Sequence, residues 1–203
     1  MDRQKIKKSF NGRVIAVSQI IASRLTRILL STLWSYSIKS SVNFKNDEVY
    51  LFISNHQSRI DPFTIFAALS MQDNIASSPV RFMTASRIYF TPLLQPILKL
   101  MGCYPTRPKR IDPVTLTVNY MKSGYSTFIF PEGRRVLPHE STPKDGIVRI
   151  IQKNDAEITP VLVRITWSRK SYFKRHIDIT ISKPRGDLKK LNADEIMQKV
   201  YSI

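Results

Sequence analysis

The sequence predicts an α/β fold: a single domain with a largely parallel, mixed central sheet flanked by helices, preceded by an N-terminal amphipathic helical segment. Short apolar runs rich in β-branched and aromatic residues alternate with segments of helical periodicity, and this alternation requires crossover connections between parallel strands. The 203 residues are 42% hydrophobic, which is enough to fill one sizeable core. We therefore divide the chain into a helical segment at 1–44 and a domain at 45–203.

An apolar stripe runs along the N-terminal segment at steps of three and four residues, as on one face of a helix. Its members are Phe10, Val14, Val17, Ile21, Leu25 and Ile28. Arg13, Arg24 and Arg27 border the stripe, where their stems can lie along apolar surface while the charged heads reach phosphate or water. The pattern predicts a helix at a membrane interface, and Trp34 and Tyr36 in its last turns favour this. A helix packed on its own domain is the alternative.

This segment is not expected to cross a membrane, because a spanning helix needs about 20 predominantly apolar residues. The longest uncharged runs are Val14–Ser23 and Ile28–Ile38, with arginines between them. A cleaved signal peptide is not expected either, since Gly12 and Arg13 interrupt the apolar run early.

Strands are predicted where short runs are apolar or alternate between apolar and polar residues. These runs are Val49–Ser54, Val80–Thr84, Ser126–Phe130, Ile158–Thr166 and Ile177–Ser182, with a short extended piece at Tyr104–Arg107. In a parallel sheet, the loops at the carboxyl ends of the strands build the functional site. The loops after Ser54 and after Phe130 both leave apolar strands at that end.

Helices are predicted between these strands and at the end of the chain, at 61–71, 92–101, 112–123, 147–153 and from 192 onward. Asp61 and Asp112 are each followed by Pro, a pattern typical of a helix start with Asp as the cap and Pro at the first position. Gly124 follows the third of these helices as a stop signal. Asn192 and Glu195 form a capping-box pattern.

The chain carries 32 Lys and Arg against 15 Asp and Glu, a formal net charge of +17. Residues 1–45 contain nine basic residues and one acidic residue, and residues 164–190 contain nine basic and two acidic residues. Residues 46–163 are nearly balanced, with 13 basic and 10 acidic residues. The excess charge therefore lies outside the central part of the chain, and it suits a polyanion such as anionic lipid or nucleic acid.

His56 follows the first core strand, and Asp61 begins the next helix five residues later. A tight turn between them could bring the carboxylate to the imidazole. The carboxylate would then accept from one ring nitrogen, while the other nitrogen takes a proton from a hydroxyl nucleophile. Spacing alone leaves a second interpretation open, in which Asp61 only caps the helix and His56 is a packed or surface residue.

A second group of candidate residues is the turn Phe130-Pro-Glu-Gly-Arg-Arg135, which ends a buried strand and presents two guanidinium groups. Arginine forks match phosphate bidentately, and Arg107 would be a third donor. Taken singly, each could equally be an exposed loop charge. Cys103 is the single cysteine, so a disulfide scaffold and a four-cysteine zinc site are excluded. The sequence near Cys103 offers no base that could activate it, so we do not expect it to be a nucleophile.

Four segments, taken together and in order, resemble the sequence blocks of the glycerolipid acyltransferases. They are Asn55-His-Gln-Ser-Arg-Ile-Asp61, Gly102-Cys-Tyr-Pro-Thr-Arg107, Phe130-Pro-Glu-Gly-Arg-Arg135 and Ile158-Thr-Pro-Val161. The branch that these segments match best is the lysophosphatidic acid acyltransferases, also called 1-acylglycerol-3-phosphate acyltransferases, and the resemblance covers about residues 45–166. Lys144 and Gly146 also stand where such proteins often carry Lys-x-Gly.

The resemblance implies an O-acyltransferase that moves an acyl group from a thioester of coenzyme A or acyl carrier protein to the free hydroxyl of lysophosphatidic acid. It implies His56 as general base and Asp61 as its orienting partner, with no covalent acyl-enzyme, no cofactor and no metal. The residues implied for the phosphate of the acceptor are Arg107, Glu132, Gly133, Arg134 and Arg135. The residues implied as supports are Asn55, Ser58, Lys144 and Pro160.

Two departures from the family motivate alternatives. Arg134 stands where the family usually has Thr, and Val136 where Ser is common, so the acceptor could be another lysophospholipid or a lyso-aminolipid. A non-catalytic lipid-binding module is a further alternative. Nucleic acid is not an expected partner, because no nucleic-acid-binding motif is present and the aromatic residues are not interleaved with the basic ones. The expected location is the cytoplasmic face of a membrane, as a peripheral or monotopic protein on anionic lipid.

Overall fold

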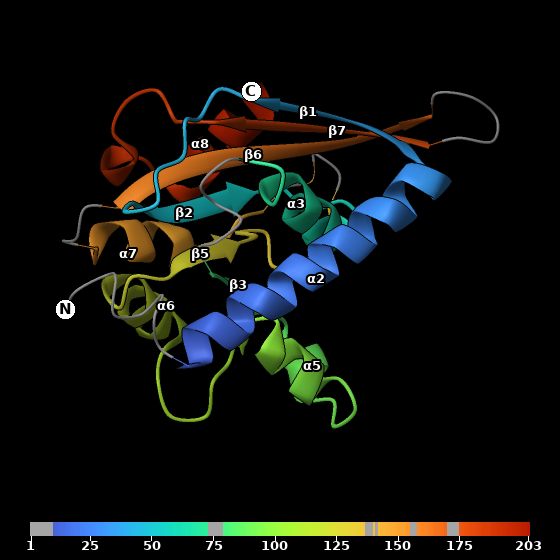
Figure 1. Cartoon of the computed structure of the whole chain (residues 1–203). Coiled ribbons are helices and arrows are strands. Elements are labelled where there is room, and N and C mark those ends of the chain that lie inside the picture. The colour runs from blue at the N-terminus through green and yellow to red at the C-terminus, as the bar shows by residue number, and fades with distance from the viewer. Residues whose placement is uncertain (1–9, 73–78, 137–139, 141, 155–157, 170–174) are drawn as a thin grey trace.

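Figure 1 shows a computed structural model of the chain, which describes residues 10–72, 79–136, 140, 142–154, 158–169 and 175–203. The first nine residues of the predicted N-terminal segment lie outside the described residues, as does the side chain of Phe10. Lys170 and Lys174 of the second basic stretch also lie outside them.

A seven-stranded sheet forms the centre of the described structure, in the order β1-β7-β6-β2-β5-β3-β4. The strands are β1 (Ser35–Ser40), β2 (Val49–Ser54), β3 (Val80–Thr84), β4 (Cys103–Pro105), β5 (Ser126–Ile129), β6 (Ile158–Arg169) and β7 (Arg175–Ser182). Every neighbouring pair is parallel except β6 and β7, which are antiparallel. The predicted α/β class with a largely parallel, mixed sheet is confirmed.

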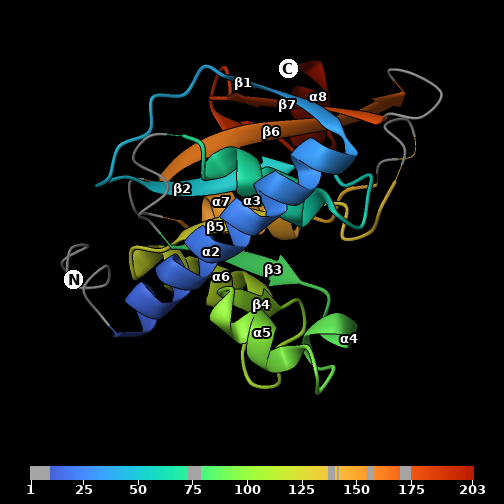
Figure 2. The same cartoon turned by 45° about the vertical axis from the view of Figure 1, so that its right-hand side comes forward.

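Helices cover both faces of this sheet (Figures 1 and 2). They are α2 (Phe10–Leu33), α3 (Asp61–Leu69), α4 (Ser86–Tyr89), α5 (Gln95–Leu100), α6 (Pro113–Lys122), α7 (Gly146–Gln152) and α8 (Ala193–Ser202), with a short 3-10 turn at Leu188–Lys190. Asp112 caps α6 through Thr115 N at 3.0 Å, as predicted. The predicted capping box of Asn192 and Glu195 is also present at the start of α8.

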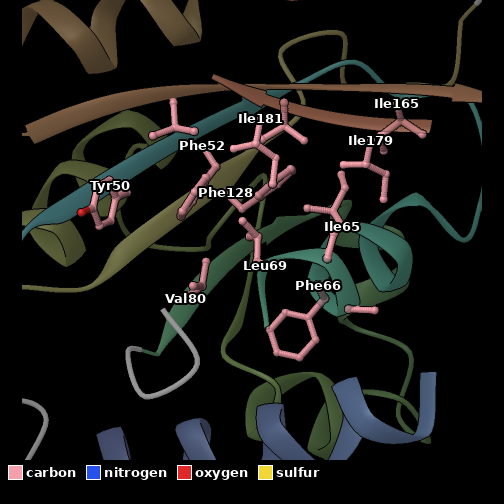
Figure 3. Close-up of a cluster of buried hydrophobic side chains, with 14 of the residues drawn as sticks. Tyr50, Phe52, Ile65, Phe66, Leu69, Val80, Phe128, Ile165, Ile179 and Ile181 are labelled. Carbon is pink, nitrogen blue, oxygen red and sulfur yellow. The ribbon is translucent and has the colours of Figure 1, made fainter. Parts of the chain in front are cut away.

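The alternation of side chains along β2 divides the core into two layers. Tyr50 and Phe52 face a cluster built with α2 and α3, part of which is drawn in Figure 3. Leu51 and Ile53 face a second cluster built with α6, α7 and α8. All six residues of β2 are buried, because this strand lies in the middle of the sheet with helices on both sides.

The sequence interpretation did not predict strand β1. Ser35–Ser40 pairs in parallel with β7, Ser35 opposite His176 and Ile38 opposite Ile179, whereas the sequence interpretation carried the helix through Trp34 and Tyr36. Helix α2 ends at Leu33. The stretch is half serine and has little intrinsic strand preference, so pairing with a neighbouring strand decides its conformation.

Helix α2 packs on the domain through a different face from the predicted stripe. Its buried side chains include Ile15, Gln19 and Leu30. By contrast, Val17 is 55% exposed and Leu25 is 63% exposed. The helix therefore does pack on its own domain, as the alternative has it, but it packs through another face and leaves the stripe from Val17 to Ile28 exposed.

Helix α2 is also longer and more apolar than the uncharged runs suggested. Its residues Asn11–Leu33 meet the length and hydropathy required to cross a membrane, with a mean hydropathy of 1.4 over the best window. The expectation that no segment could do so is therefore wrong as far as length and composition go. Those two properties are weak grounds for a spanning helix, and the bonds of Gln19 tie this helix to the domain.

Gln19 is the polar anchor of α2. Its Nε2 donates to Val80 O at 2.6 Å and to Met101 O at 2.8 Å, and its Oε1 accepts from Val80 N at 3.1 Å. One buried side chain thus joins α2 to the start of β3 and the end of α5.

We predict that Gln19→Ala lowers the free energy of unfolding by about 1–3 kcal/mol, because it leaves buried backbone groups unpaired. Ser31→Ala is the matched control on the exposed side of the same helix, where the hydroxyl bonds to Ile28 O and to no other described residue. Urea denaturation measures both variants. Equal stability of the two variants would contradict this role of Gln19.

Candidate active site

The candidate site lies where two parallel strands end side by side. β2 and β5 pair with Leu51 opposite Thr127 and Ile53 opposite Ile129, so the loops that leave their carboxyl ends meet at one edge of the sheet. The first loop carries Asn55 and His56, and the second begins with Phe130. The register of the sheet thus brings together two segments that lie more than 70 residues apart in the sequence.

His56 and Asp61 form the predicted pair. His56 Nδ1 lies 2.9 Å from Asp61 Oδ2, and Asp61 is fully buried. A carboxylate can only accept a hydrogen bond, so this pairing requires a proton on Nδ1, and in a neutral ring Nε2 is then the unprotonated nitrogen. Nε2 has no hydrogen-bond partner within the described part of the chain, and the His56 side chain keeps 19% of its surface exposed. The ring is therefore oriented and still accessible.

Asp61 does not cap its helix, contrary to the sequence expectation. The cap position of α3 is Ile60, which has no side-chain cap bond. The Asp61 carboxylate instead points back into the preceding loop, where Oδ2 accepts from Gln57 N at 2.6 Å and Ser58 N at 2.7 Å. Oδ1 accepts from the indole Nε1 of Trp167 at 2.8 Å. Four donors therefore hold this buried charge.

Two buried polar side chains, Asn55 and Glu132, bind the backbone around the His56 loop. Asn55 pairs with the backbone of Ile165 in both directions, each bond 2.8 Å long. Glu132 accepts from His56 N at 2.8 Å and from the hydroxyl of Tyr201. Glu132 is buried and bonds to the loop, so it supports His56 rather than the phosphate of a ligand, which corrects the role implied by the resemblance.

Phe130 joins the His56 ring to a neighbouring cavity. The two rings stack with centroids 4.3 Å apart, and Phe130 also lines a cavity of about 350 Å³. Arg107, Lys144 and Arg87 bring positive charge to this cavity. Its apolar lining comes from Met83, Val114, Ile129, Ile147 and Ile150. Such a combination suits a ligand with an anionic head and an apolar body.

Gly133 and Lys144 shape one wall of the cavity together. Gly133 has a φ of +63°, and a Cβ placed there would lie 2.9 Å from Lys144 Nζ. The backbone N of Lys144 donates to Pro131 O at 3.0 Å. The absence of a side chain at Gly133 therefore lets the ammonium group approach the turn closely.

The structure does not bring all the predicted residues to this cavity. Arg134 and Arg135 are exposed, and neither lines it. Pro160 lies opposite Leu51 near the start of β6 and lines a separate cavity of about 320 Å³. Since β6 runs parallel to β2, its early residues lie at the end of the sheet away from His56, so Pro160 is not a support of the site. Ser58 supports the loop through its backbone N.

Sequence reasoning did not identify two residues that contact the site, Trp167 and Tyr201. Trp167 lies near the end of β6 and Tyr201 in the last helix, both outside the recognised segments. The signal that could have found Trp167 is the strand order, because a parallel neighbour of β2 that continues past Val163 reaches the same edge of the sheet. For Tyr201 no local signal exists, since its contact depends on how α8 packs.

Cys103 does not contribute to the site. It is partly buried, and burial raises the pKa of its thiol, which disfavours the thiolate needed for nucleophilic attack.

Comparison with known proteins places these features in a family. A family model described as Acyltransferase matches residues 36–164. The chloroplastic 1-acyl-sn-glycerol-3-phosphate acyltransferase of Brassica napus is 27% identical in an alignment of 123 positions that covers 57% of this chain and 33% of that protein. A second chloroplastic protein of the same name, from Arabidopsis thaliana, is 25% identical in an alignment of 123 positions that covers 57% of this chain and 32% of that protein. The chain thus spans about a third of the length of these relatives.

The fold is similar to a solved structure as well. The crystal structure of the 1-acyl-sn-glycerophosphate acyltransferase PlsC from Thermotoga maritima superposes with a TM-score of 0.63 at 18% identity. The alignment covers 99% of this chain and 79% of that one. At this identity the likeness concerns the fold alone.

We predict that Glu132 and Tyr201 are energetically coupled. Glu132→Gln turns an amide group toward donors that need an acceptor, and Tyr201→Phe removes one of those donors, so each change should cost about 1–3 kcal/mol of the free energy of unfolding. The double variant should deviate from additivity by about 0.5–3 kcal/mol. Urea denaturation of the cycle measures this, with Tyr36→Phe as a control whose hydroxyl bonds to none of the described residues. Additive losses would contradict the coupling.

Proposed function

The chain belongs to the acyltransferase family, and from this premise we propose that it transfers an acyl group from a thioester to the free hydroxyl of lysophosphatidic acid, forming phosphatidic acid. The observation that carries the proposal is the bond between His56 Nδ1 and the buried carboxylate of Asp61. The names of the relatives support the acceptor. Either coenzyme A or acyl carrier protein could carry the acyl group.

The chemistry follows from the tautomer that Asp61 imposes. His56 Nε2 takes the proton of the acceptor hydroxyl as the hydroxyl oxygen attacks the thioester carbonyl. The resulting imidazolium is stabilised by the adjacent carboxylate. When the carbon–sulfur bond breaks, the leaving thiolate takes the proton back from the imidazolium, and His56 returns to its starting state. This sequence requires neither a metal ion nor a covalent acyl-enzyme.

The cavity beside Phe130 supports an anionic, amphipathic acceptor. Arg107 and Lys144 can form charge-assisted bonds to a phosphate, and the apolar wall next to them can receive hydrocarbon. Of the phosphate-binding residues that the resemblance implied, Arg107 and Gly133 fit this cavity. Lys144, which was expected to be only a support, joins them as a cation of the site.

Membrane association follows from the exposed side of α2. Four members of its apolar stripe, Val17, Ile21, Leu25 and Ile28, are exposed to solvent, with Arg13 and Arg24 exposed beside them. Apolar side chains flanked by arginines suit the boundary between headgroups and acyl chains of an anionic membrane. We therefore place α2 on the membrane surface, as a peripheral or monotopic anchor on the cytoplasmic face.

We predict that His56→Ala reduces acyl transfer by a factor of about 10² to 10⁴, which is the usual contribution of a general base. Asp61→Asn keeps the size of the side chain but removes the charge that stabilises the imidazolium, so it should lower turnover as well. His176→Ala is the matched control, because His176 also bonds an aspartate, Asp178 at 3.1 Å, but lies on β7 and lines no described cavity near His56. Transfer to lysophosphatidic acid in detergent measures all three variants, and circular dichroism checks their folding.

Full activity of His56→Ala or Asp61→Asn would contradict the mechanism. The same assay, run with a panel of lyso-acceptors and both thioester donors, tests the substrate. Turnover of another lysophospholipid or of a lyso-aminolipid, without turnover of lysophosphatidic acid, would show that lysophosphatidic acid is not the acceptor. Lipid binding without turnover on any acceptor would favour a binding module over an enzyme.

A further inference from the structure

Residues 86–101 form a surface with an unusual amount of exposed apolar area. Neither α4 nor α5 contains a buried residue, and Leu93, between them, is 83% exposed. The exposed large apolar residues of this segment are Ile88, Phe90, Leu93, Leu94, Ile97 and Leu100, which we call the α4–α5 surface. Apolar patches of this kind on soluble proteins mark sites that contact another molecule or a membrane.

The charge around this surface favours an anionic occupant. Between Pro79 and Ile111 the chain has six basic residues and no acidic one. Arg87 and Lys99 lie within the α4–α5 surface itself, and both are exposed. A second copy of this chain would bring a like charge of +17 to the contact. A bilayer with anionic headgroups matches both the cations and the apolar side chains between them.

The α4–α5 surface lies beside helix α2, next to the face of α2 that packs on the domain. Gln19 of α2 donates to the carbonyl of Met101, directly after α5, and Ile15 lies against Gly102. Both views of the whole chain show α5 beside the first half of α2, at the end of the molecule farthest from β1 and β7 (Figures 1 and 2). The α4–α5 surface and α2 are therefore neighbours in space, and the exposed stripe of α2 lies on another face of that helix from Ile15 and Gln19.

The same segment also forms part of the cavity beside the dyad. Ser86 and Arg87 of α4 line that cavity. The backbone N of Arg107 donates to Ser86 Oγ at 2.7 Å, which ties the segment to the phosphate-binding loop. A lipid that contacts the α4–α5 surface is thus adjacent to the cavity wall.

We propose that the α4–α5 surface inserts into an anionic phospholipid bilayer as a second docking element beside α2, so that the cavity opens at the lipid surface. The proposal of insertion rests only on the exposure and the charge of the α4–α5 surface. The part that concerns lipid entry rests on the proposed function.

Bromolipid quenching of tryptophan fluorescence tests the insertion. Leu93→Trp and Gln152→Trp each add one exposed tryptophan to the full chain, the first on the α4–α5 surface and the second on α7, across the sheet. The vesicles contain phosphatidylcholine and phosphatidylglycerol with brominated acyl chains. The fluorescence of the wild type gives the background from Trp34 and Trp167, which is subtracted. The added fluorescence of Leu93→Trp should be quenched at least about twofold more than that of Gln152→Trp, because bromine quenches only groups within the acyl region. Equal quenching would overturn the proposal.

A double variant, Leu93→Gln with Ile97→Gln, separates docking from catalysis. It should bind these vesicles about tenfold more weakly, since it removes two large apolar side chains from the contact. Turnover of detergent-dispersed substrate should be unchanged. Unchanged vesicle binding, or a shift from dimer to monomer without a change in binding, would overturn the docking role. If the wild type has no turnover in detergent, the proposed function fails while the quenching result still decides the insertion.

A separate observation concerns Trp167. Three of the four donors to Asp61 bond to Oδ2, and the indole of Trp167 is the donor recorded for Oδ1 among the described residues. The structure assigns Trp167 as a positioning residue, which holds the rotation of the carboxylate so that Oδ2 faces His56. Trp34 packs edge-on against Trp167, with ring centroids 6.2 Å apart, and makes no recorded bond to Asp61.

Trp167→Phe keeps a ring in place and removes only the donor. Because this role rests on the proposed function, its readout is kinetic: kcat should fall about tenfold, the order expected for a hydrogen bond to a charged group, while KM for the acceptor changes less than about twofold. Trp34→Phe is the matched control and should leave both constants unchanged. Equal effects of the two variants, or an unchanged kcat in Trp167→Phe, would overturn the role. Slow hydrogen exchange at the Trp167 indole checks the bond in the wild type independently of turnover.

Discussion

The candidate active site depends on one buried carboxylate. Asp61 is fully buried and accepts four hydrogen bonds, without which burial of its charge would be costly. Two of the donors are backbone groups of the loop after β2, so the carboxylate shapes the turn that carries His56. A third donor is His56 itself, and the fourth comes from β6. One side chain therefore sets the loop, the orientation of the imidazole and the contact between two strands.

A second layer of buried polar groups keeps that loop in place. Asn55 bonds the loop to β6, and Glu132 bonds it to the turn after β5 and to Tyr201 of the last helix. Three separate elements thus converge on His56. The positions of β6 and of the turn after β5 follow from a sheet in which β2 lies between β5 and β6, which is why the two sequence motifs meet although they are distant in the chain. The position of Tyr201 depends on how α8 packs.

Much of this arrangement could be predicted from sequence, because its signals are local. The apolar runs of the central strands, the Asp112 cap and the pairing of His56 with Asp61 all depend on residues close together in the chain. The rest depends on tertiary contacts. Strand β1 forms because β7 is available to pair with it, Trp167 reaches Asp61 through the register of β6, and the face of α2 that packs inward is decided by the hydrogen bonds of Gln19. The exposure of the α2 stripe agrees with the predicted interfacial helix, whereas the face that packs inward was not predicted.

We propose that Asp61 fixes the tautomer of His56 and so makes Nε2 the base. The most direct test is nitrogen NMR of the protein labelled at histidine, with His56 assigned by comparison with His56→Ala. We expect neutral His56 to carry its proton on Nδ1, with Nε2 unprotonated. A neutral ring that carries its proton on Nε2 would contradict it.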